Sequence, residues 1–308
     1  MNKNQIAALE MRRKSPIPVL RLIKIENGIA RISDFETNYL TKVDVDDGLY
    51  SIEGNQLVQA DPRGEEFPIL ELGEKIQEIE LEKNTLLPFF NYTDKKSIHK
   101  YAKCIHFNSI DEKLNIVATN GHIMRSKSFP IEFDGQCSAL IENIMKNVLK
   151  RMAKTSLKIS FYEKHVGFES ADEQVIVEKL DETYPDYQSV IPSQQYFEVF
   201  TIPTKRLKQL ISENKTASDD SEISHILFKD ETIRFCSGHK DGEIAHKVED
   251  NGGTIVPSAH DCCLIMGMDS NKFWINPKLL QKILEGKEMT FYYDNEPKYD
   301  RPFIIGVK

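Results

Sequence analysis

Short apolar runs separated by turn residues dominate the chain and predict a protein made mostly of strands. Predicted strands lie at 104–109, 114–119, 157–162, 166–169, 174–180, 197–202, 225–228, 232–236, 245–248, 289–293 and 302–307. A further pair, 19–25 and 29–32, is joined by Glu26-Asn27-Gly28, and Asn-Gly is a strong signal for a two-residue hairpin turn. The pattern therefore indicates a hairpin-rich architecture.

Helical periodicity is confined to four segments. A helix at 139–152 would gather one apolar stripe from residues four apart, namely Leu140, Ile144, Val148 and Met152. The other predicted helices are 2–14, 203–212 and 276–286. In the last of these Asn276 is a suitable N-cap, Pro277 takes the first helical position and Gly286 ends the helix.

One template recurs along the chain. A strand runs into a helix at 200–211 and again at 273–284, with Ile202 and Ile275 lying 73 positions apart, and a weaker copy occupies 138–148. Such a unit cannot bury its helix stripe alone, but several in sequence can share sheet-backed cores and curve into a ring. We therefore predict an α+β fold of repeated strand–helix–strands units, with sheets outside and helices inside.

Charge is sorted between the predicted helices and the rest of the chain. The formal net charge is −8, yet segments 2–14, 142–154, 203–212 and 276–286 together carry +10, which leaves −18 elsewhere. A helix surface rich in Lys and Arg normally carries comparable Glu, since all three favour helices. The bias instead indicates helices that face DNA phosphates while strands and loops face solvent.

Composition excludes several classes of protein. No apolar stretch approaches the roughly 20 residues needed to span a bilayer, and residues 1–14 are polar rather than an apolar signal segment. Five scattered cysteines argue against a disulfide framework and for a reducing compartment. We expect a cytoplasmic protein with no membrane role.

Metal and catalytic chemistry find little support. Zinc-type ligands occur at Cys236, His239, His260, Cys262 and Cys263, but their spacing does not match a zinc ribbon. The chain has no Walker loop and no Gly-x-Gly-x-x-Gly motif, and no motif places a nucleophile beside His122. We expect no enzymatic activity, no cofactor and no metal; a metal-dependent enzyme built on the 260–263 region is the alternative.

Two short strings carry a resemblance to a known family. Residues 116–124 read Ile-Val-Ala-Thr-Asn-Gly-His-Ile-Met, and residues 180–192 read Leu-Asp-Glu-Thr-Tyr-Pro-Asp-Tyr-Gln-Ser-Val-Ile-Pro. In this order they resemble the DNA polymerase III beta subunit, the bacterial sliding clamp, which has a Val-Ala-Thr-Asp-Gly-His-Arg-Leu string and a Phe-Pro-Asp-Tyr run followed by Val-hydrophobic-Pro. The string Ser33-Asp34-Phe35-Glu36 is similar to the family's Thr-Asp-Leu-Glu.

The resemblance implies the DNA-clamp fold in three domains. These would be a reduced N-terminal domain at 1–80, a central domain at 81–192 and a C-terminal domain at 193–308. The first of them looks shortened, because its second half is largely missing.

The resemblance also implies a peptide-binding cleft between the second and third domains. Carried over by position, the cleft would comprise Thr119, Gly121, His122, Ile123, Met124, Pro185, Ser189, Val190, Asn276, Leu279, Ile304 and Ile305. Met124 would offer an adaptable apolar wall, and Pro185 with Val190 a rigid edge. For each residue, ordinary packing at a domain junction is the alternative.

Some positions depart from the family pattern. Ile123 and Met124 stand where the family has Arg and Leu, Ala102 falls on an apolar wall position, and the family's Pro or Met near the C-terminus is replaced around Gly306 and Val307. These changes leave the peptide preference open.

Basic residues complete the predicted function. Contacts to DNA are expected from Lys14, Lys96, Lys146, Lys150, Arg151, Lys205, Arg206 and Lys208. The predicted protein is a processivity factor that encircles double-stranded DNA as a head-to-tail dimer, without sequence preference. Its partners would be the replicative DNA polymerase and the clamp loader. The alternative is a clamp-like adaptor or decoy that does not close and binds replication-protein peptides.

Overall fold

The computed structural model describes residues 17–307 with internal gaps. The positions left out are 34–36, 54–55, 62–65, 143–144, 153–154, 191–195, 217–222, 230–231, 238–244, 248–252, 256–260, 266–272, 276–279, 282–283, 285 and 294–302. The described chain is rich in strands and divides into two compact units. Unit 1 comprises 1–88, 107–112 and 131–181, and unit 2 comprises 89–106, 113–130 and 182–308.

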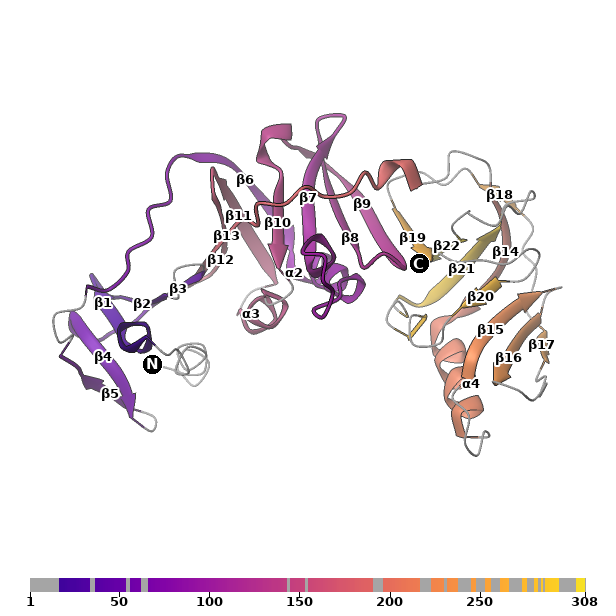
Figure 1. The fold of residues 1–308 in the computed structure, drawn as a ribbon, viewed down its shortest axis with the longest axis horizontal. Coiled ribbons are helices and arrows are strands. Elements are labelled where there is room, and N and C mark those ends of the chain that lie inside the picture. The colour runs from indigo at the N-terminus through magenta and orange to yellow at the C-terminus, as the bar shows by residue number, and fades with distance from the viewer. Residues whose placement is uncertain are drawn as a thin grey trace. The chain divides into compact units, whose positions relative to one another are not determined.

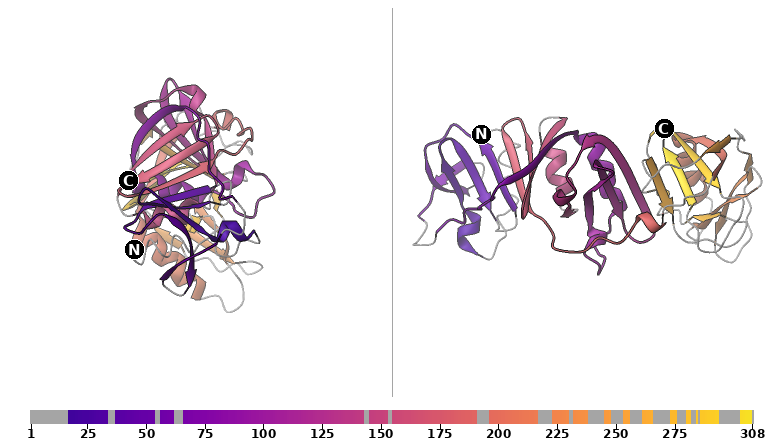
Figure 2. Two further views of the ribbon diagram at one scale, coloured as in Figure 1. Left: turned by 90° about the vertical axis from the view of Figure 1, so that its left-hand side faces the viewer. Right: turned by 90° about the horizontal axis from the view of Figure 1, so that it is seen from above.

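Unit 1 is built on one nine-stranded sheet with the order β5-β4-β1-β2-β3-β13-β12-β11-β6 (Figure 1). Its strands are β1 (Ile23–Glu26), β2 (Ile29–Ser33), β3 (Thr37–Lys42), β4 (Gly48–Glu53), β5 (Gln56–Gln59), β6 (Lys75–Glu82), β11 (Ser156–Tyr162), β12 (His165–Ser170) and β13 (Glu173–Glu178). Each strand in this order runs antiparallel to its neighbours. Because β3 pairs with β13, segments from far apart in the sequence share this sheet (Figure 2).

Aromatic side chains form the densest part of the unit 1 core. Phe161 on β11 is fully buried and meets Phe107 and Phe133 edge-to-face, with ring centroids 5.6 and 5.0 Å apart. Alternate β11 residues Leu157 and Ile159 are also fully buried. The strand predicted at 157–162 therefore turns one face into the core, as pleated geometry requires.

Two hairpin turns have a left-handed backbone at both central residues. Asn27 and Gly28 have φ of 54° and 71°, and Asp111 and Glu112 have φ of 50° and 59°. Two successive positive φ values define a type I′ turn, whose twist matches that of the flanking strands.

Unit 2 contains most of a second sheet and the whole of a third. The second has the order β10-β7-β8-β9-β19-β22-β21-β14-β18 and the third β17-β16-β15-β20. The second sheet is formed by β7 (Cys104–Ile110), β8 (Lys113–Thr119), β9 (Ile123–Glu132), β10 (Ala139–Glu142), β14 (Tyr196–Pro203), β18 (Gly253–Ile255), β19 (Asp261–Ile265), β21 (Glu288–Tyr293) and β22 (Phe303–Val307). The third sheet is formed by β15 (Ile223–Lys229), β16 (Thr232–Ser237), β17 (Ala245–Lys247) and β20 (Phe273–Ile275).

Helices are short and few in the described chain. The α-helices are α2 (Lys83–Leu86), α3 (Met145–Arg151) and α4 (Thr204–Thr216). The 3₁₀ segments are η1 (Pro18–Arg21), η2 (Leu87–Tyr92), η3 (Tyr101–Lys103), η4 (Gly135–Cys137) and η5 (Gln188–Val190). None of the helices described is both long and apolar enough to cross a membrane.

Two sequence predictions need correction. The helix expected over 139–152 begins only at Met145, because Ala139, Leu140 and Ile141 are all buried as β10. Three successive buried residues fit a strand covered on both faces, not a helix with one apolar stripe. The first strand of the hairpin is also shorter than expected: Pro18 opens a 3₁₀ turn and β1 starts at Ile23.

The remaining helix predictions have different outcomes. The helix at 203–212 is confirmed as α4, which follows β14 as the repeat template requires. Leu280 and Gln281 are helical, while the rest of the N-terminal half of the predicted 276–286 helix and the whole of 2–14 lie outside the described residues.

Candidate functional site

The turn between β8 and β9 is fixed by its own side chains. The Asn120 side-chain oxygen accepts from the backbone N–H groups of His122 and Ile123, both at 3.0 Å. The Thr119 hydroxyl accepts from the Gly121 N–H at 3.1 Å and donates to the Ile123 carbonyl at 2.9 Å. Gly121 has φ of 86° with open space where a Cβ would stand. The turn therefore has a defined shape before any partner binds.

Only part of the predicted cleft at this turn is open to solvent. Gly121 and His122 are exposed and Thr119 is half-buried. Ile123 and Met124, by contrast, are 0% and 2% exposed. They open β9, which pairs with β8 along one edge and with β19 along the other, in the middle of the sheet. In this structure both side chains belong to the core of unit 2.

The sheet register brings the turn and the C-terminal strand together. Met124 pairs with Leu264 of β19, and Leu264 pairs in turn with Ile304 of β22. Cys263 likewise stands between Arg125 and Ile305. The side chains of β19 and β22 lie outside the described residues, so only the register is known: Ile304 and Ile305 are level with Met124 and Arg125, with β19 between them.

The linker string is held to unit 2 by aromatic packing. The Tyr184 ring lies 4.5 Å from the ring of His106 on β7, and it meets Tyr187 and Tyr101 edge-on at 6.2 and 6.0 Å. Burial raises the pKa of Tyr184 well above its usual range, and the neighbouring Thr119 backbone partly opposes this rise. Burial also lowers the pKa of His106 to about 4, so the ring is neutral near pH 7.

Exposed residues of the linker follow directly after Tyr184, which lies close to the Thr119 backbone. Pro185 and Ser189 are both exposed. The Ser189 hydroxyl donates to the Asp186 carbonyl at 2.7 Å, and the Asp186 carboxylate accepts from the Gln188 N–H at 3.2 Å. Val190 ends η5, but its side chain lies outside the described residues, as do Asn276 and Leu279.

The anchoring rings themselves were not predicted as functional. Tyr184 and Tyr187 stand inside the Tyr-Pro-Asp-Tyr string, which is the signal that could have found them. His106 and Tyr101 carry no such signal, because their contact with the linker joins segments far apart in the sequence.

Basic residues lie on the outer faces of two helices, α3 and α4. In α3, Lys150 and Arg151 are exposed and Lys146 is half-buried, while Val148 and Leu149 are buried. In α4 the exposed cations are Lys205, Arg206 and Lys208, and the buried residues are Leu207 and Ile211. Each helix is thus apolar inside and cationic outside, the pattern of a helix docked on a sheet. Lys96 is also exposed, in a loop of unit 2, whereas Lys14 lies outside the described residues.

Metal ligands do not gather in the part of the chain that the structure describes. No group of three or more His, Cys, Asp or Glu side chains there is placed to hold an ion. The sequence candidates His239 and His260, and the side chains of Cys236, Cys262 and Cys263, lie outside it. The described cysteines Cys104 and Cys137 are both buried in the core.

Comparison with known proteins identifies the fold. No family model matches the chain, and no curated protein matches it. Several solved structures do match the chain. A DNA polymerase sliding clamp from Pseudomonas aeruginosa superposes with a TM-score of 0.69 at 14% identity, covering 99% of this chain and 97% of that one. The DNA polymerase III beta subunit of Thermotoga maritima gives 0.68 at 17% identity, covering 99% and 95%.

A third match is similar. The putative DNA polymerase III beta subunit of Eubacterium rectale superposes with a TM-score of 0.69 at 14% identity, covering 99% of this chain and 96% of that one. The chain therefore has the sliding-clamp fold, as its two strings predicted, in a sequence that has diverged far from these structures.

Proposed function

We propose that this chain is a DNA sliding clamp, a processivity factor that encircles double-stranded DNA and tethers the replicative polymerase. The observation that carries the proposal is the match of almost the whole chain to DNA polymerase III beta subunits, at a TM-score of 0.69 over 99% of its residues. A match confined to one repeat would fit many α+β proteins. A match over the full length requires the same succession of units.

The cationic helix faces support a role on DNA. Both α3 and α4 expose Lys and Arg while burying apolar residues, although the chain as a whole has a net charge of −8. Lysine and arginine that neutralise phosphates release counterions and so favour binding without reading base sequence. Such contacts let a protein slide along a duplex, which a processivity factor must do.

We further propose three domains and head-to-tail closure. The domains are 1–80, 81–192 and 193–308, and a dimer of such chains would provide six domains around the duplex. The clamp loader would open this dimer and place it on DNA. In this proposal the chain catalyses no reaction and needs no cofactor.

The polymerase would be held at the surface formed by the Thr119 turn and the linker. Gly121, His122, Pro185 and Ser189 are exposed there, and hydrogen bonds or aromatic packing fix the backbone around them. A preformed surface costs less entropy to bind than a mobile one. This supports recognition of a short linear peptide from the polymerase.

Retention on circular DNA tests the proposal. The chain is loaded by the clamp loader of its own cell onto a nicked circular plasmid and onto the same plasmid cut once, and both are gel-filtered in high salt. A ring held by topology stays on the circle and runs off the linear ends. Equal loss from both would contradict encirclement. Peptide binding without retention would instead favour the adaptor that does not close.

A further inference from the structure

An extended segment of unit 1 is anchored at both ends. Residues 68–74, here called the strap, lead into β6 without helix, strand, turn or bend, as Figure 1 shows. Before the strap, Phe67 is 9% exposed and packs with the buried residues of η1. After it, the Gln77 side chain donates to the Glu132 carbonyl at 2.7 Å and accepts from the Asp134 N–H at 2.9 Å. The strap is therefore held extended between two fixed points.

The strap leaves its backbone hydrogen-bonding groups open. Among the described residues, none makes a backbone hydrogen bond to the strap. Pro68 has no N–H to donate, and Gly73 departs from strand conformation with φ of 69°. The stretch that can pair with a further strand is therefore 69–72. An unpaired extended edge of this kind is a template for strand addition.

The side chains of 69–72 alternate between two sides. Ile69 is 60% exposed, the highest value among the large hydrophobic residues described in unit 1, and Glu71 is also exposed. Leu70 and Leu72 are half-buried. Successive side chains of an extended chain point to opposite sides, so Ile69 and Glu71 share the outer side. A strand laid beside the strap would meet one apolar and one acidic side chain there.

The strap and its flank are acidic. Residues 65–74 contain four Glu and no Lys or Arg. The cation that follows, Lys75, is already paired with Glu78 at 2.7 Å. This charge repels nucleic-acid phosphates and anionic lipid headgroups. Pairing two straps with one another would double the same charge, and like charges across a strand pair are destabilising. A cationic partner fits instead.

We propose that the strap binds an extended protein segment of alternating apolar and basic residues, which adds to it as a β-strand. The backbone of that segment would exchange hydrogen bonds with 69–72. An apolar side chain would pack beside Ile69, and a Lys or Arg would face Glu71. In this mode the main chain supplies affinity and alternate side chains supply specificity. The strap belongs to unit 1, whereas the proposed polymerase site includes the Thr119 turn of unit 2, so the inference does not rest on the proposed function.

Binding of designed peptides to the full chain tests the inference. The probe is the labelled hexapeptide Lys-Val-Lys-Val-Lys-Val, followed by fluorescence anisotropy, with Glu-Val-Glu-Val-Glu-Val as its charge-reversed control. We expect the basic peptide to bind and the acidic one not to bind. Methylating every second backbone nitrogen of the basic peptide removes the N–H groups of one edge, and one of the two possible patterns should weaken binding about tenfold or more.

Hydrogen exchange locates the bound peptide. Exchange followed by mass spectrometry should slow at the amides of 69–72 when the basic peptide is added, because newly formed hydrogen bonds protect them. The acidic peptide should leave these amides unchanged.

Variants of the strap test its side chains. Ile69→Ser should weaken binding of the basic peptide. Glu71→Lys should weaken it about fivefold or more, because an attractive cross-strand pair becomes a repulsive one, and should raise the affinity for the acidic peptide. As matched controls, Ile98→Ser changes an exposed isoleucine of unit 2, and Glu163→Lys reverses an exposed charge between β11 and β12. Both controls should bind like the unaltered chain, and all variants should keep its melting temperature.

Several results would overturn the inference. These are no binding of the basic peptide, equal binding of the acidic or of both N-methylated peptides, and protection of amides outside the strap in place of 69–72. Strap variants that bind normally, or controls that weaken as much as the strap variants, would contradict it as well. Retention on circular DNA is measured separately, so this inference and the proposed function fail by different results.

Discussion

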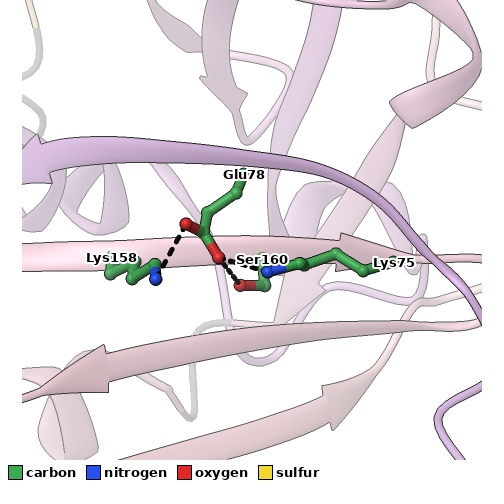
Figure 3. Close-up of polar contacts among 4 residues, drawn as sticks. All are labelled: Lys75, Glu78, Lys158 and Ser160. Atoms are coloured by element: carbon green, nitrogen blue, oxygen red, sulfur yellow. Dashed lines mark hydrogen bonds and ion pairs between the residues drawn. The ribbon is translucent and has the colours of Figure 1, made fainter.

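Glu78 on β6 accepts from Lys158 Nζ on the neighbouring strand β11 at a distance of 2.8 Å (Figure 3). Its second carboxylate oxygen accepts hydrogen bonds from Lys75 Nζ at 2.7 Å and from the Ser160 hydroxyl at 3.1 Å. These donors hold the pKa of Glu78 down to about 2, with the Lys158 hydrogen bond the largest cause. Because β6 is an edge strand of the unit 1 sheet, the ionised carboxylate helps to hold β6 against β11.

Replacing this carboxylate should therefore weaken unit 1 in a pH-dependent way. The lowered pKa means that the stabilisation is complete above the unfolded-state value near 4.3 and is lost as pH falls toward 2. Glu78→Gln should lower the free energy of unfolding at pH 7 by about 0.5–1 kcal/mol, because the network is partly solvent-exposed. Urea denaturation at pH 7 and at acid pH measures the difference, which should shrink on acidification. Glu74→Gln, an exposed carboxylate outside the network, is the control; a constant difference at all pH values would contradict the account.

The aromatic core of unit 1 should tolerate shape changes poorly. Phe161 is fully buried between Phe107 and Phe133. Phe161→Ala leaves a cavity and should destabilise unit 1 by about 3–5 kcal/mol, whereas Phe161→Leu keeps most of the volume and should cost clearly less. Chemical denaturation monitored by circular dichroism distinguishes the two variants. Similar losses for both would mean that the site collapses around the smaller residue.

The hydrogen bonds of the Thr119 turn should control peptide binding through its shape. Asn120→Ala removes the acceptor of two backbone N–H groups, while Asn120→Asp keeps an oxygen in the same place. We expect the alanine variant to bind a polymerase-derived peptide several-fold more weakly and the aspartate variant to bind it normally. Isothermal titration calorimetry checks both. Equal affinity for the two variants would show that the turn geometry is irrelevant to binding.

Exposed and buried residues of the proposed peptide site should respond differently to a new charge. Pro185→Asp alters an exposed linker residue and should abolish peptide binding without changing the melting temperature. Met124→Asp places a carboxylate at a position only 2% exposed, which costs several kcal/mol unless the group is paired. That variant should melt at a clearly lower temperature. A folded Met124→Asp chain that loses only peptide binding would instead make Met124 part of an open cleft.

The cations of α4 should each contribute to the salt dependence of duplex binding. Changing Lys205, Arg206 and Lys208 to Gln removes up to three phosphate contacts, each worth about 0.9 in the slope of log affinity against log salt. Anisotropy of a labelled duplex across a salt series measures this slope. Lys113→Gln with Lys164→Gln, which changes two exposed lysines outside the helices, should leave it unchanged. An unaltered slope in the α4 variant would place DNA elsewhere.

Local patterns in the sequence predicted most of the individual elements. Asn27-Gly28 has the left-handed backbone that a tight hairpin needs, and α4 follows β14 as the repeat template required. These features depend on neighbouring residues, which a sequence displays directly.

Pairings between distant segments were harder to predict. The strand β9 carries polar residues among its apolar ones, and β19 is a short Cys-Cys-Leu-Ile run, so neither was predicted as a strand. Each is stabilised by the other through the register that joins Met124 to Leu264. The contact of Tyr184 with His106 has the same character: it depends on tertiary structure, not on local propensity.

The burial of Met124 at the proposed peptide site could not be predicted from the sequence either. The resemblance placed Met124 in a cleft wall, and the described residues enclose it. Exposure depends on what the rest of the fold brings against a side chain, which a matching motif does not specify.

Molar mass in solution tests the central proposal most directly. Size-exclusion chromatography with light scattering, run over a dilution series at physiological salt, reports whether the chain closes on itself. A ring predicts a dimer that persists on dilution, because an encircling protein must not fall apart on DNA. A monomer at every concentration would contradict encirclement and leave the peptide-binding adaptor as the better account.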